Sequence, residues 1–302
     1  MQNAPIAFFA YNRPEHTKSA LESLAMCEGA KDSELFVFCD APKTQEDKAK
    51  VDDVRKIVRF RKWCGQVNIV LREHNLGLAD SITSGVSDIC GRYGKVIVLE
   101  DDLVQSPLFL DYMNRALQFY KDSEKVMHIA AYTPDLKTKL PEAFFYRATS
   151  CWGWGTWKRA WNFYEPDARK LYDSIIRKGL ANEFNVQRSM NFLETLSANM
   201  EGKLKTWAIK WYASVFLREG LCLHPGQSLI MNIGLDGSGV NCGRSDDFDV
   251  TLRNERIQDF PLPVVEDKVA LAALINFYNS LKPRPERVGL KRAILNLFGV
   301  SK

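Results

Sequence analysis

The chain has 302 residues, of which 46% are hydrophobic and 26% charged, a composition typical of a folded globular protein. Its net charge of +4 argues against a dedicated nucleic-acid-binding protein. Seven scattered cysteines, none in a C-x-x-C spacing, favour reduced thiols over a disulfide framework or a zinc site.

The N-terminal segment lacks the basic start and long apolar core of a secretory signal. No apolar run in the sequence approaches the roughly 18 residues of a membrane span. We therefore expect a cytoplasmic protein.

Short apolar runs alternate with amphipathic stretches over the first hundred residues. The runs at 6–10, 35–39, 67–71 and 95–99 predict buried strands, and helices are expected at 15–24, 46–63 and 78–93. This alternation predicts an α/β fold with a mostly parallel, Rossmann-like sheet flanked by helices. Polar residues follow each run at once, and ligands of such sheets bind at the carboxyl ends of the strands.

The remainder of the chain has a different sequence pattern. A helix is expected over 108–127, followed after Pro141 by aromatic-rich segments and longer helices, a charged link at 246–256 and a helical C-terminus. We therefore divide the chain into a first half (1–105), a second half of the same domain (106–260) and a C-terminal helical tail (261–302).

Three adjacent carboxylates, Glu100, Asp101 and Asp102, end the fourth predicted strand. Like charges this close resist simultaneous ionisation unless a cation compensates them, and hard divalent metals prefer carboxylate and phosphate oxygens. The simpler alternative is a solvated turn that caps the next helix.

The stretch Val96–Tyr112 around this triplet closely resembles a strand-turn-helix segment of N-acetylglucosaminyltransferase I and of bacterial glycosyltransferases with the same nucleotide-diphospho-sugar (GT-A) fold. Further similarity lies in the segments 8–14, 37–40, 74–77 and 151–157. Together these segments cover residues 5–160 well and residues 205–243 more weakly.

The resemblance implies that residues 1–105 form a nucleotide-sugar-binding half and residues 106–260 an acceptor-binding half. It also implies a role for each matching residue. Asp102 would ligate Mn²⁺ or Mg²⁺, Asp101 would face the ribose and Glu100 the donor sugar. Arg13 would approach the diphosphate. Asp40 would accept a hydrogen bond from the nucleotide base, which favours uridine. Asn75 and Gly77 would belong to the loop that closes over the nucleotide. A surface salt bridge for Arg13 and a turn residue for Asp40 are the alternatives.

Tryptophans dominate two clusters in the second half. Trp152 and Trp154 lie among glycines in Cys151–Trp157, and Trp207 and Trp211 bound a second segment. Flat indole faces suit stacking on a sugar, so these four are candidates for an acceptor or sugar platform; core packing is the alternative.

The resemblance does not extend to the catalytic base. In related enzymes a similar Trp-bounded segment carries an aspartate thought to be the base, but Ala208 follows Trp207 here. Asp236, in the Gly-rich loop 232–239, is the best replacement, although an Asp-Gly turn explains it equally well. Asn241 stands near the place where many related enzymes have a histidine, so no second protein ligand to the metal is assigned.

The tail from 282 to 302 holds six basic residues and one acidic residue, with apolar positions at helical spacing. Residues 284–302 are therefore a candidate amphipathic helix on the anionic inner face of the cytoplasmic membrane; a helix docked on its own domain is the alternative.

The sequence thus predicts a hexosyl- or N-acetylhexosaminyltransferase that is metal-dependent and inverting. It would move a sugar from a UDP-sugar to a glycan, carried on a polyprenol lipid, in bacterial surface polysaccharide synthesis. Two alternatives stay open: a catalytically impaired carbohydrate- or nucleotide-sugar-binding protein of the same fold, and a sugar-nucleotide nucleotidyltransferase.

Overall fold

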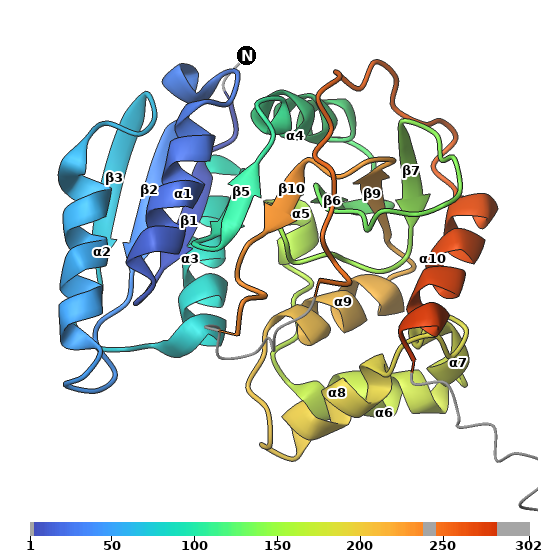
Figure 1. The fold of residues 1–302 in the computed structure, drawn as a ribbon. Helices are drawn as coiled ribbons and strands as arrows, with labels where there is room; N and C mark the ends of the chain where they lie inside the picture. Colours follow the sequence, from blue (N-terminus) through green and yellow to red (C-terminus); the bar gives the residue numbers. More distant parts are fainter. Residues whose placement is uncertain (1–2, 238–245, 283–302) are drawn as a thin grey trace, which may run out of the picture.

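The computed structural model describes residues 3–237 and 246–282. Its centre is an eight-stranded mixed sheet in the order β3-β2-β1-β4-β8-β6-β9-β7 (Figure 1). The strands are β1 (Ile6–Ala10), β2 (Glu34–Cys39), β3 (Gln66–Leu71), β4 (Lys95–Glu100), β6 (Val126–Ala130), β7 (Ala143–Tyr146), β8 (Trp154–Trp157) and β9 (Leu221–Pro225). A separate ribbon pairs β5 (Leu103–Gln105) antiparallel with β10 (Ile230–Asn232).

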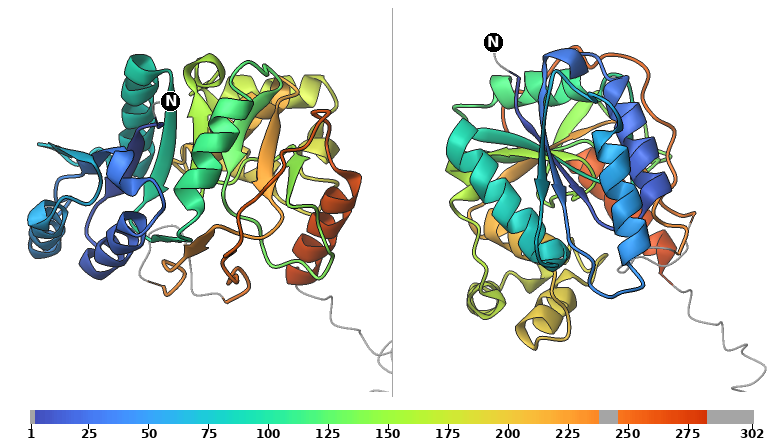
Figure 2. Two further views of the ribbon diagram at one scale, coloured as in Figure 1. Left: turned by 90° about the horizontal axis from the view of Figure 1, so that it is seen from above. Right: turned by 90° about the vertical axis from the view of Figure 1, so that its left-hand side faces the viewer.

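Helices cover both faces of the large sheet. They are α1 (Pro14–Ala25), η1 (Ala30–Asp32, a 3₁₀ turn), α2 (Lys48–Phe60), α3 (Gly77–Tyr93), α4 (Phe109–Phe119), α5 (Lys158–Trp161), α6 (Ala168–Arg177), α7 (Ala181–Phe184), α8 (Phe192–Met200), α9 (Ala208–Leu217) and α10 (Lys268–Leu281). Seen from the β3 edge, α1 and α2 lie on one side of the sheet and α3 on the other (Figure 2). In the described part of the chain, every helix is too short or too polar to span a bilayer.

Side-chain alternation explains why the first four strands read as continuous apolar runs. In β1, Ile6 and Phe8 pack into the core beneath α1 and α2, whereas Ala7 and Phe9 pack into the core beneath α3. Both faces are buried, so no polar residue is needed along the strand. The predicted parallel arrangement of β1, β2, β3 and β4 is confirmed.

The second half extends the same sheet. β8 pairs antiparallel with β4, with Val98 opposite Trp154, so the boundary expected at residue 105 divides one continuous sheet. The expected helix over 108–127 is too long: α4 ends at Phe119, a turn follows, and β6 begins at Val126.

The tail from 284 lies outside the described residues, so its predicted membrane contact is untested. Among the described residues, Cys27, Cys39, Cys64, Cys90 and Cys222 are free thiols.

A buried histidine links β6 to α9. His128 of β6 is 0% exposed; its Nδ1 accepts from the Trp211 indole N–H at 3.1 Å, and its Nε2 lies 3.0 Å from the Ser150 carbonyl. Because Nδ1 is an acceptor, Nε2 carries the proton, and the ring is neutral. Burial, with a smaller contribution from His224, lowers the pKa of His128 to about 3.

This histidine is expected to make folding sensitive to acid. The unfolded state binds a proton near the ordinary histidine pKa of ~6.5, whereas the folded state does not, so stability is present above that pH and is lost as pH falls. We predict that the gap in unfolding free energy between the native chain and His128→Gln narrows by about 2 kcal/mol from pH 6.5 to pH 5. Urea unfolding at both pH values measures this gap. The exposed His74→Gln serves as the matched control, and a gap that does not change with pH would contradict the neutral assignment.

Candidate functional site

The candidate site lies where the strand order of the sheet reverses. The chain runs outward from β1 through β2 to β3 and then returns to the other side of β1 with β4. Such a switch point leaves a crevice at the carboxyl ends of the two central strands. Arg13 follows β1 and the acidic triplet follows β4, so both groups lie at this crevice.

Local sequence explains the position of Arg13. Pro14 is the first residue of α1, where its missing N–H costs no hydrogen bond. A residue before proline is held out of the helical region, and Arg13 accordingly has φ −119° and ψ 79°. The guanidinium is thereby directed across the crevice rather than along the helix.

The guanidinium of Arg13 bridges two of the three carboxylates. It donates to Asp101 Oδ1 through Nη2, and its Nη1 lies 3.0 Å from Asp102 Oδ2. Asp101 also accepts from the Tyr11 backbone N–H through Oδ2, at 3.2 Å. Asp101 is therefore a buried anchor for Arg13 with both oxygens engaged, whereas the Asp102 side chain keeps 16% of its surface exposed.

The cluster holds more negative charge than its one guanidinium balances. Burial raises the pKa of Glu100 to about 8, and the charges of Asp102 and Asp101 add to the rise. Burial also raises the pKa of Asp101 to about 6, although Arg13 opposes the change. The pKa of Arg13 is itself raised: burial lowers it, but Asp101 and Asp102 outweigh that effect. A further cation at this crevice would favour the fully ionised triplet.

The β5–β10 ribbon brings a distant loop onto this cluster. The N–H of Ile233 donates to the Asp102 carbonyl at 2.8 Å, which fixes the start of the loop. Gly234 packs so closely that a Cβ there would lie 2.3 Å from Asp102 Oδ2 and 2.8 Å from Arg13 Nη1. Only glycine fits at this position without displacing the ion pair.

Asp236 lies on the outer side of the same loop. Its Oδ2 is 3.2 Å from Nε2 of His16 on α1, and its side chain is 49% exposed. His16 also lies 3.3 Å from the carbonyl of Ile233, so it holds the loop beside the N-terminal end of α1. The structure thus brings Arg13, the triplet and Asp236 to one edge of the sheet, although Asp236 is more than 130 positions later in the sequence than Asp102.

Asp40, Asn75 and Gly77 form a second group, which connects the loops after β2 and β3. Asp40 accepts from the backbone N–H groups of Ala41, Leu76 and Gly77 at 2.9–3.1 Å, and both of its oxygens are used. Asn75 donates to the Ala41 carbonyl at 2.7 Å. Asp40 thereby holds the start of α3, and the contact with a nucleotide base that the resemblance implies for it stays a prediction.

The tryptophan clusters lie mostly inside the protein. Trp154 and Trp211 are 0% exposed and Trp207 is 3% exposed. Trp154 stacks on Trp207 with ring centroids 5.0 Å apart. These three rings form core between the sheet and α9, so the expected sugar platform is wrong for them in this structure. Trp152 alone is partly exposed, packed edge-on against Tyr132 and Phe248.

The sequence reasoning assigned no role to Tyr11, Asn12 or His16, although Tyr11 and Asn12 are among the polar residues that follow the first predicted strand. Tyr11 and Asn12 both donate to Asp47, at 2.9 and 2.8 Å, and these bonds lower the pKa of Asp47 to about 2, with the bond from Asn12 the larger cause. His16 holds the loop around Asp236. The Tyr11-Asn12 pair was a visible signal, since polar residues directly after a buried strand predict contacts at its carboxyl end.

Comparison with known proteins adds little to this picture. No protein-family model matches the sequence, and neither does any curated protein sequence. Among solved structures the chain is similar to S. aureus TarS, with 15% identity and a TM-score of 0.32 over 46% of this chain and 23% of that one. A TarS structure of residues 1–349 is similar with 16% identity and a TM-score of 0.30 over 46% of this chain and 41% of that one. The chain spans less than half of either solved chain, so the chemistry of the site has to be derived from its own residues.

Proposed function

We propose that the chain is a metal-dependent glycosyltransferase of the GT-A type, which moves a sugar from a uridine-diphosphate donor to a glycan acceptor. The observation that carries this proposal is the convergence of Arg13 with Glu100, Asp101 and Asp102 at the switch point between β1 and β4. A crevice with one guanidinium and excess carboxylate suits a ligand that brings both phosphate and a divalent cation.

The donor set fits Mn²⁺ or Mg²⁺ shared with a diphosphate. Among the described residues, no group of three or more His, Cys, Asp or Glu side chains encloses a metal site. Magnesium-type ions are usually held by one or two carboxylates together with substrate phosphates, and Asp102 is the partly exposed carboxylate that meets this need. When bound, the metal supplies charge that neutralises the leaving diphosphate.

The chain's own residues divide the remaining tasks. Arg13 would contact the diphosphate while Asp101 holds the Arg13 guanidinium in place. Glu100 would face the donor sugar. The ribose contact expected of Asp101 would have to be made beside its two existing bonds. Asn75 and Gly77 would close over the nucleotide, with Trp152 as the remaining aromatic candidate for the sugar.

Asp236 is the proposed general base for an inverting transfer. Two observations support it: its carboxylate is half exposed, and its loop packs on Asp102 and Arg13 through Gly234. The acceptor hydroxyl has to approach the donor at this same edge, and a base must lie within hydrogen-bond reach of that hydroxyl. Ala208, at the start of α9, has no group that can accept a proton.

Thermal-shift measurements against a set of UDP-sugars, each with and without Mn²⁺, test this proposal. We expect a rise in Tm of several degrees for at least one UDP-sugar with Mn²⁺ and a smaller rise without the metal, because binding to the folded state alone stabilises it. No shift with any UDP-sugar would refute the proposal. A shift without any turnover on glycan acceptors would favour a binding protein, and a response confined to UTP with a sugar phosphate would favour a nucleotidyltransferase.

A further inference from the structure

The outer edge of β3 carries backbone groups with no partner strand in the described part of the chain. β3 is the end strand of the sheet and pairs with β2 on one side. The N–H of Gln66 donates to the Ser33 carbonyl at 3.2 Å, and the N–H of Arg72 donates to the Cys39 carbonyl at 2.9 Å. Alternate residues of a strand turn their backbone groups to the same side, so Val67, Ile69 and Leu71 turn theirs outward.

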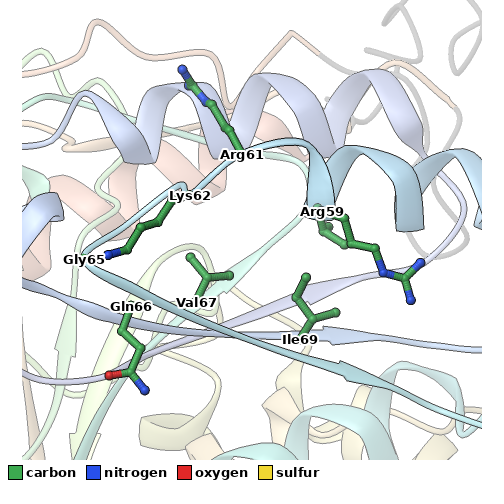
Figure 3. A pocket seen from close by; sticks show the side chains of 8 residues that line it. Arg59, Arg61, Lys62, Gly65, Gln66, Val67 and Ile69 are labelled. Atoms are coloured by element: carbon green, nitrogen blue, oxygen red, sulfur yellow. The ribbon is translucent and has the colours of Figure 1, made fainter.

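An open groove lies over Val67 and Ile69. It has a volume of about 530 Å³ and is bounded by the last turn of α2 and by β3 (Figure 3). The partly exposed Val67 and Ile69 provide apolar surface. Arg59 and Lys62 extend over the strand, whereas Arg61 points away from it and stacks on Trp63 at 4.3 Å. No acidic side chain among the described residues lines the groove.

Natural sheets usually protect an edge with a charge, a proline or a bulge on the strand, or cover it with another element. The sequence of β3, QVNIVL, contains no charge and no proline, and its register with β2 is regular over all six residues. At the other end of the sheet, β7 lies beside α10 (Figure 1). Next to the groove, Phe60 is 82% exposed. This edge therefore has the features of a surface that another chain covers.

The chemistry of the groove selects among possible occupants. A bilayer brings no backbone donors, and placing unpaired N–H and C=O groups in hydrocarbon costs several kcal/mol for each group. A second copy of this chain would bring its own Arg59 and Lys62 against the first pair, so like charges would oppose edge-to-edge pairing. An extended segment with carboxylate side chains meets both needs, because its backbone pairs with β3 and its charges complement the two cations.

We propose that the edge of β3 is a docking site for an extended, acidic segment of a partner protein, which adds to the sheet beside Val67, Ile69 and Leu71 under Arg59 and Lys62. This mode of recognition takes its affinity from main-chain hydrogen bonds and its selectivity from side chains beside the strand. The site lies away from the Arg13 cluster, and the inference does not depend on the proposed function.

A labelled peptide of alternating glutamate and valine is the probe. About eight residues suffice to span the strand, since an extended residue advances about 3.3 Å. We expect the peptide to bind in fluorescence anisotropy, and Arg59→Glu/Lys62→Glu to weaken binding at least about tenfold, a change of about 1.4 kcal/mol. Arg177→Glu/Lys178→Glu, two exposed cations at the end of α6, is the matched control and should change binding less than twofold.

Hydrogen exchange supplies the second readout. Bound peptide should slow exchange of the amides of Val67, Ile69 and Leu71 and leave Asn68 and Val70, which already face β2, unchanged. Three results would each overturn the proposal: no binding of the peptide, binding that survives the double charge reversal, or binding without protection of the three outward amides. Capture by phosphatidylglycerol vesicles that is lost on the same charge reversal would also overturn it, in favour of a membrane surface.

Discussion

Asp102→Asn is expected to lower turnover of the best UDP-sugar donor by about 10³-fold or more and to remove its dependence on Mn²⁺. Asparagine keeps the shape of the side chain and an oxygen opposite Arg13 but loses the charge that a divalent cation needs. A lost transition-state interaction of about 4 kcal/mol corresponds to this factor. Sugar transfer or donor hydrolysis measured across a Mn²⁺ titration gives the comparison.

A matched control separates loss of the site from loss of a carboxylate in general. Asp88→Asn removes a surface carboxylate on α3 that forms an exposed ion pair with Arg92 at 3.2 Å. Its turnover should remain close to that of the native chain. Native-like, metal-dependent turnover in Asp102→Asn would show that the metal assignment is wrong.

The second large effect is on stability. Arg13→Gln is expected to destabilise the fold by about 3–5 kcal/mol, because removing one partner of a buried pair leaves the other charge uncompensated. Asp101 is 3% exposed and Arg13 is its only described ion-pair partner, so little water can replace the guanidinium. Unfolding free energies from urea titration measure the change.

Two further variants make this test specific. Arg92→Gln breaks an exposed pair with Asp88 and should change stability by less than about 1 kcal/mol. The double variant Arg13→Gln/Asp101→Asn should recover part of the loss, because no buried carboxylate is then left at position 101. An Arg13→Gln protein as stable as the native chain would mean that Asp101 is well solvated without its partner.

Much of the first half of the fold could be predicted from apolar runs and their spacing. β1, β2, β3 and β4 begin and end within about one residue of the predicted strands, since strands buried on both faces need continuous apolar sequence. α4 was predicted too long, because the apolar helical spacing stops at Tyr120, where a turn leads into β6. The insertion of β8 between β4 and β6 was not predictable, since its partners are set by contacts with strands that are distant in the sequence.

The candidate site divides in the same way. Arg13 and the triplet were found because each directly follows a strand, and parallel strands place their carboxyl ends at one edge. Indole rings carry no such positional signal. Trp152 and Trp154 lie two residues apart, yet Trp152 is partly exposed, whereas Trp154 belongs to the central strand β8 and is fully buried. The role of Asp40 at the start of α3 was not predictable, because the backbone N–H groups that it accepts from, Leu76 and Gly77, are more than 30 residues away in the sequence.

The sequence by itself determined the parallel first half, the carboxyl-edge position of Arg13 and the acidic triplet, since these depend on local periodicity and on chain order. Only the tertiary structure decided that Arg13 bridges Asp101 and Asp102, that Gly234 and Asp236 return to the same edge, and that the outer side of β3 is left open. Those features depend on through-space distances and burial, which arise when segments far apart in the chain pack together and exclude water.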